Sequence, residues 1–178
     1  ARAVHLRAAM PIVHLAARAW SLPVALTHHE VAPELWSWLR SAFPDAFAAM
    51  LMPNHFHLVG EDAGPEPARD KATNLIRSVR RTRSALASIR WEPIEAPSLL
   101  TDRGKLLRSV RYVALNPIRA RLTDDPLAWP WSTLRDCVGS VVDPWVDVDR
   151  LARLAGRPTQ GFSAWLHGYI AADERVRA

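Results

Sequence analysis

Leu51-Met52-Pro53-Asn54-His55-Phe56-His57-Leu58-Val59 is the stretch that decides the fold, because it links two short apolar runs through a turn-prone Pro-Asn pair. The runs Ala46–Met52 and Phe56–Glu61 are predicted to be adjacent strands. Since side chains alternate between the faces of a strand, His55 and His57 should project side by side, with Phe56 on the opposite face. Two neighbouring imidazoles can share a metal ion and leave coordination positions open. A His-x-His pair also occurs as two ordinary, partly exposed histidines, so a functional site needs a chemical partner elsewhere in the chain.

A helix that begins at Asp102 offers such a partner. Asp102 suits an N-cap, and Pro117 disfavours helical geometry at the residue before it, so the helix should run to about Leu115. At about 100° per residue, four polar residues of this segment fall within about 40° of one direction: Lys105, Arg108, Tyr112 and Asn116. A tyrosine beside two cations suits phosphate chemistry. The alternative is a core or interface tyrosine with solvated basic neighbours.

The other periodic segments predict a mixed α+β chain with no internal repeat. Alternation over Pro11–Ala17 predicts a strand, and the prolines in Trp91–Leu100 favour an extended connection or an edge strand. Apolar residues at helical spacing predict two long helices, from Thr27, which could cap the first, to Phe43 and from Ala68 to Arg90. Two short helices are expected near Val148–Leu154 and Phe162–Ala172.

Composition is that of an ordinary globular protein, and the modest net charge does not by itself indicate a nucleic-acid partner, so the distribution of the charge must decide. The chain has 178 residues, 49% hydrophobic and 23% charged, with a net charge of +5. That length favours one domain, which we divide into a core over residues 1–140 and a helical extension packed on it over 141–178. Cys137 is the only cysteine, which excludes an intramolecular disulfide and a cysteine-built zinc cluster. The sequence shows neither a membrane-spanning run nor a signal-peptide pattern, so we expect a cytoplasmic protein.

Three motifs resemble the REP-associated tyrosine transposases, which belong to the HUH single-strand transposases. The first is the run 51–59 quoted above. The second is Arg111-Tyr112-Val113-Ala114-Leu115-Asn116-Pro117-Ile118-Arg119-Ala120, and the third is Trp129-Pro130-Trp131-Ser132-Thr133. They occur in the order found in that family and, with a weaker match over His14–Arg18, span most of the chain from residue 11 to about 140.

The resemblance implies a fold, a reaction and a set of site residues. The fold would be an antiparallel, ferredoxin-like sheet with helices packed on it, the histidines on a central strand and the tyrosine on a helix. Tyr112 would be the nucleophile that cuts single-stranded DNA at hairpins of palindromic repeats and forms a 5′-phosphotyrosine link. His55, His57 and Asn116 would bind the divalent metal, Mg or Mn. The protein would act as a monomer or a homodimer.

DNA contacts are predicted from the placement of basic residues. Arginine and lysine side chains near the site could bind the DNA backbone, and we single out Arg18, Arg77, Arg80, Arg81, Lys105, Arg108 and Arg119. Each of them could equally lie on an ordinary solvated face. Trp91 and Trp131 could stack on unpaired bases.

Two departures from the family pattern leave alternatives open. Ala19 follows Arg18 where these transposases often have glycine, and the segment before the tyrosine helix lacks their Trp-Gln-Gly-Arg run. A domesticated protein that binds hairpin DNA without cutting it would fit these departures. A histidine-metal hydrolase unrelated to DNA would need only His55 and His57.

Overall fold

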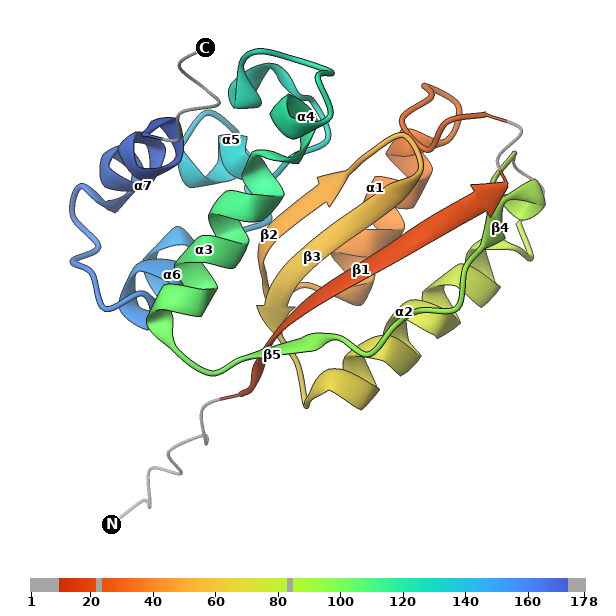
Figure 1. The fold of residues 1–178 in the computed structure, drawn as a ribbon, viewed down its shortest axis with the longest axis horizontal. Coiled ribbons are helices and arrows are strands. Elements are labelled where there is room, and N and C mark those ends of the chain that lie inside the picture. The colour runs from red at the N-terminus through yellow and green to blue at the C-terminus, as the bar shows by residue number, and fades with distance from the viewer. Residues whose placement is uncertain (1–9, 22–23, 83–84, 173–178) are drawn as a thin grey trace.

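A computed structural model describes residues 10–21, 24–82 and 85–172 (Figure 1). The strands are β1 (Ile12–Ser21), β2 (Ala46–Leu51), β3 (His55–Glu61), β4 (Arg90–Trp91) and β5 (Ser98–Leu100). The longer helices are α1 (Ala32–Ala42), α2 (Pro65–Val79), α3 (Arg103–Ala114), α6 (Val148–Leu154) and α7 (Phe162–Ala171). Shorter turns of helix are η1 (Ala85–Ser88), α4 (Asn116–Arg119), η2 (Pro126–Ala128) and α5 (Leu134–Cys137).

All strand pairs are antiparallel, and β3 lies between β2 and β1 in the order β2-β3-β1-β4. β5 also pairs with β1, at the opposite end of that strand from β4. Both histidines of the His-x-His pair are therefore on a central strand. The expected α+β fold with an antiparallel sheet is confirmed.

Helices cover both faces of the sheet (Figure 1). On one face α1 and α2 pack against Leu15, Phe56 and Leu58 in a first core cluster. On the other face α3, α6 and α7 form a second cluster with Phe47 and Val59. The C-terminal helices thus share one core with the tyrosine helix. None of the helices in the described ranges is long and apolar enough to cross a membrane.

Several predicted boundaries are confirmed and four are wrong. β2 and α6 match their predicted ranges closely, and Asp102 caps α3 by accepting a bond of 2.8 Å from the backbone N–H of Lys105. The first strand is longer than predicted, since it extends four residues beyond Ala17 to Ser21. Trp91–Leu100 is an extended connection, as its prolines suggested, with the short strand β4 at its start and β5 at its end.

The predicted start of α1 at Thr27 is wrong. The helix begins at Ala32 after turns that bond Val31 and Ala32 to the carbonyl of His28. Pro33 lies in its first turn, and because proline has no N–H, the helical bond that a longer helix would require there cannot form.

The long helix predicted over 68–90 is also wrong at both ends. It begins at Pro65, behind Gly64, whose φ of 143° is available to glycine but not to most residues. It ends at Val79, because Thr82 turns back and donates through both its N–H and its hydroxyl to the Val79 carbonyl. Leu86 and Ile89 continue the apolar spacing of the helix in the sequence, but in the structure they lie outside it. Leu86 lies in η1 and Ile89 directly after it, and both pack into the first core cluster.

Candidate active site

The register of β1 against β3 gathers polar side chains on the face covered by α3. Ala16 pairs with His57, Arg18 with His55, and His14 with Val59. Paired residues of an antiparallel ladder point to the same face. His14, Arg18, His55 and His57 therefore share one face, whereas Phe56 packs on the other face as predicted.

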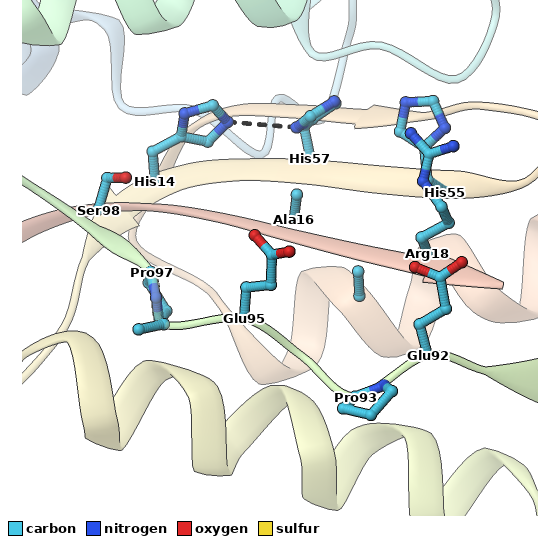
Figure 2. A pocket seen from close by; sticks show the side chains of 12 residues that line it. His14, Ala16, Arg18, His55, His57, Glu92, Pro93, Glu95, Pro97 and Ser98 are labelled. Carbon is cyan, nitrogen blue, oxygen red and sulfur yellow. Dashed lines mark hydrogen bonds between the residues drawn. The ribbon is translucent and has the colours of Figure 1, made fainter.

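These side chains line a cavity of about 310 Å³ (Figure 2). Its opposite wall is the connection between β4 and β5, which includes Glu92, Pro93, Glu95 and Pro97. Figure 2 shows both carboxylates pointing inward, Glu92 toward Arg18 and Glu95 toward the side of His57. The cavity thus combines imidazoles, one guanidinium and two exposed carboxylates around the middle of β1.

Burial keeps the histidines of this cavity uncharged. It lowers the pKa of His55 from 6.5 to about 4, with a further contribution from the Arg18 charge. It lowers the pKa of His57 from 6.5 to about 3, and neighbouring His55, His14 and Arg18 add to the effect. The pKa of His14 is also lowered by burial. Neutral imidazoles carry the lone pair that a metal ion needs.

Hydrogen bonds fix the rings of the His-x-His pair. The His55 Nδ1 atom lies 2.8 Å from Asn54 Oδ1, and the His57 Nδ1 atom lies 3.2 Å from His14 Nε2. The two rings of the pair are perpendicular, with their centroids 4.9 Å apart.

Tyr112 lies beside the rings of His57 and His14. Its ring centroid is 5.5 Å from that of His57 and 5.9 Å from that of His14, with both rings meeting it edge to face. The opposite side of α3 buries Leu106, Val110 and Val113, so the helix presents Tyr112 outward, and 40% of that residue is exposed. The interpretation of Tyr112 as a core tyrosine is therefore wrong.

A basic cleft of about 540 Å³ shares His14 with the histidine cavity. Besides Tyr112 it is lined by four cations and by Tyr169 of α7; the cations are Lys105, Arg108, Arg111 and Arg119. The Arg119 guanidinium lies 4.4 Å from the centre of the Tyr112 ring, and that of Arg111 lies 4.9 Å from the centre of the Tyr169 ring. Among the residues that line this cleft in the described part of the chain, none is acidic.

Two of the three predicted metal ligands line the histidine cavity. His55 and His57 line one cavity and fit a divalent cation by chemistry and protonation state. Asn116 is buried at the start of α4, outside that lining, and its amide nitrogen donates to the Tyr112 carbonyl at 2.9 Å. Within residues 10–21, 24–82 and 85–172, no three His, Cys, Asp or Glu side chains form a ready metal cluster. The role of Asn116 stays a prediction.

The predicted DNA contacts divide into two groups. Lys105, Arg108 and Arg119 line the basic cleft and Arg18 lines the histidine cavity. The others, Arg77, Arg80 and Arg81, belong to the end of α2 and the turn after it, on the far face of the sheet from Tyr112. Trp91 and Trp131 pack against the first core cluster.

Sequence reasoning missed three residues of this arrangement: His14, Arg111 and Tyr169. His14 could have been found from the alternation of His14, Ala16 and Arg18 along the first predicted strand. Arg111 and Tyr169 meet only because α7 packs beside α3, and the local sequence gives no signal of that contact.

Comparison with known proteins supports the fold. The chain is similar to a solved structure of a REP-associated tyrosine transposase bound to a REP hairpin, with a TM-score of 0.52 and 15% sequence identity. The match covers 79% of this chain and 88% of that one. No protein-family model and no curated protein matches the sequence.

Proposed function

We propose that this protein is a single-tyrosine HUH transposase that cuts and rejoins single-stranded DNA at hairpins through Tyr112. One observation carries the proposal: the Tyr112 ring stands over His57, where a basic cleft meets the histidine cavity. A histidine-metal hydrolase unrelated to DNA would need only the two histidines, and its reaction would not require a tyrosine and four cations beside them. The solved structure that this fold resembles is that of a transposase bound to a REP hairpin.

In this proposal the four cations of the cleft bind the DNA backbone and bring one phosphodiester to Tyr112. The phenol oxygen loses its proton and attacks the phosphorus, the bond from phosphorus to the 3′ oxygen breaks, and that oxygen takes up a proton and leaves as a free 3′-hydroxyl. The downstream piece of DNA stays bonded to Tyr112 through its 5′ phosphate, so the energy of the phosphodiester is kept in the phosphotyrosine link. The 3′-hydroxyl of another strand end then attacks the same phosphorus and releases the tyrosine.

His55 and His57, with Asn116 as the predicted third ligand, would hold a divalent metal such as Mg or Mn. When bound, the metal supplies charge that offsets the negative charge on the phosphate being cut. The chain's own contribution is to keep both imidazoles neutral and oriented, and Arg119 stacks on Tyr112 and so restricts its ring.

The test is formation of a covalent protein–DNA adduct with a labelled hairpin that carries single-stranded flanks, in the presence of Mn²⁺ or Mg²⁺. The chain has two tyrosines, and both line the basic cleft, so Tyr112→Phe and Tyr169→Phe form a matched pair. We expect the adduct to vanish in Tyr112→Phe and to persist in Tyr169→Phe, while Tyr112→Phe still binds the hairpin. An adduct that survives Tyr112→Phe would show that the nucleophile is another residue.

The non-cutting alternative is favoured by the two departures from the family pattern, Ala19 and the missing Trp-Gln-Gly-Arg run. Ala19 lies near the end of β1, where the register with β4 shifts, and is buried in the first core cluster. Tight hairpin binding without an adduct under either metal would support this alternative and contradict the proposal.

A further inference from the structure

His14 connects the two halves of the site, although it belongs to neither the His-x-His pair nor the tyrosine helix. Its Nε2 atom lies 3.2 Å from His57 Nδ1, and the two ring centroids are 5.3 Å apart. The same ring meets Tyr112 edge to face at 5.9 Å. His14 also lines both the histidine cavity and the basic cleft.

The bond to Asn54 determines which nitrogen of His55 can bind a metal. An amide oxygen only accepts hydrogen bonds, so His55 Nδ1 must carry the proton that it shares with Asn54 Oδ1. A neutral imidazole carries one proton, which leaves the lone pair of His55 on Nε2.

The bond between His57 and His14 has two possible directions. If His57 Nδ1 donates to His14 Nε2, the lone pair of His57 lies on Nε2, as it does in His55. If His14 Nε2 donates instead, His57 Nε2 carries a proton and cannot bind a metal. Only the first direction leaves both rings of the pair as ligands through equivalent atoms.

We propose that His14 is a positioning residue that accepts the Nδ1 proton of His57, and so fixes both the tautomer of His57 and the orientation of its ring toward Tyr112. The proposal rests on the proposed function, because it assigns His57 to a metal. Histidine ligands of metals commonly donate their second ring N–H to an acceptor in this way, and loss of the acceptor costs roughly 10- to 100-fold in metal affinity. Here the acceptor is a second imidazole, supplied by the neighbouring strand.

The metal-binding test uses three variants and Mn²⁺ as the probe, with free Mn²⁺ measured by electron paramagnetic resonance. His14→Leu places an apolar side chain in the same position and removes the acceptor, so Mn²⁺ should bind roughly 10- to 100-fold more weakly. His14→Gln restores an acceptor through its amide oxygen and should recover most of the affinity. His167→Leu is the matched control, because His167 is exposed on α7, and its affinity should equal that of the wild type.

Equal Mn²⁺ affinity in His14→Leu and the wild type would overturn the inference. Equal weakening in His14→Gln and His14→Leu would also overturn it, because an acceptor would then not be what His14 provides. Thermal unfolding of each variant without metal measures the purely structural effect of the substitution. The order of His14→Gln and His14→Leu in thermal stability should differ from their order in Mn²⁺ affinity.

A second measurement does not depend on metal binding. Nitrogen-15 NMR of the metal-free protein distinguishes protonated from unprotonated ring nitrogens, and we expect His57 to carry its proton on Nδ1 and His14 on Nδ1. A proton on His57 Nε2 would overturn the inference even if the protein cuts DNA. Conversely, a wild-type protein that binds no Mn²⁺ but shows the expected tautomers would contradict the metal site of the proposed function and leave the bond to His14 intact.

Discussion

Acid should destabilise this protein specifically through its site histidines. Burial lowers the pKa of His55 from 6.5 to about 4 and that of His57 from 6.5 to about 3. Above pH 6.5 both rings are neutral in the folded and in the unfolded chain, so they add no pH dependence. As the pH falls through 6.5, the unfolded chain takes up protons and the folded chain does not, so stability is lost down to the folded pKa values.

The size of the effect follows from that proton uptake. Each histidine removes about 1.4 kcal/mol of unfolding free energy per pH unit below 6.5, which amounts to about 2 kcal/mol per ring at pH 5. His57→Gln has no titrating ring at this position. We therefore expect its loss of stability between pH 7 and pH 5 to be smaller than that of the wild type by about 2 kcal/mol.

The assay is urea denaturation at pH 7 and pH 5 with a chelator present, so that no metal competes with protons. His167→Gln is the control, since it removes an exposed histidine and should lose as much stability as the wild type over the same interval. The reasoning is refuted if His57→Gln loses as much stability as the wild type between the two pH values.

Three further predictions concern the support of α3 and the cleft. Asp102→Ala removes the N-cap of α3 and should cost about 0.5–2 kcal/mol in urea denaturation. Phe162→Ala opens a cavity in the second core and should cost about 3–5 kcal/mol by the same assay, because Phe162 is only 2% exposed. Arg111→Gln should weaken binding of single-stranded DNA and lower its salt slope by roughly 0.7, whereas Arg157→Gln, a cation outside the cleft, should leave the slope unchanged. An unchanged slope in Arg111→Gln would remove that residue from the proposed DNA-binding surface.

Local patterns in the sequence were sufficient to predict those features of the structure that depend on residues close together in the chain. Alternation placed His55 and His57 on one face, and helical spacing placed Tyr112 opposite the buried Leu106 and Val110. The N-cap at Asp102 was predictable because its bond spans three residues. The errors arose where one residue outweighed the pattern, as Pro33 does at the start of α1.

The contacts of His14 could not be derived from local patterns, because they depend on the register between β1 and β3. A shift of one residue in the pairing would turn His14 to the opposite face. The register depends on how the apolar residues of both strands pack together, which neither strand determines alone. The register of β1 against β3 that buries Leu15 and Phe56 on one face and Val59 on the other also brings His14 within hydrogen-bond reach of His57. The polar contact is thus a by-product of how the apolar residues pack.

The C-terminal helices support Tyr112, the proposed nucleophile, even though they lie far from it in sequence. Tyr112 is 40% exposed, so its own burial only partly holds it beside His57. Its position is set by the buried side of α3. That side packs against the sheet, on β2 and β3, and against Phe162 and Leu166 of α7. Because the sheet anchors the histidines and this second core anchors the tyrosine, loss of packing at α7 would move Tyr112 while leaving His55 and His57 in place. Damage to residues 141–172 should therefore impair strand cleavage more than it impairs the histidine cavity, which depends on β1, β3 and the connection between β4 and β5.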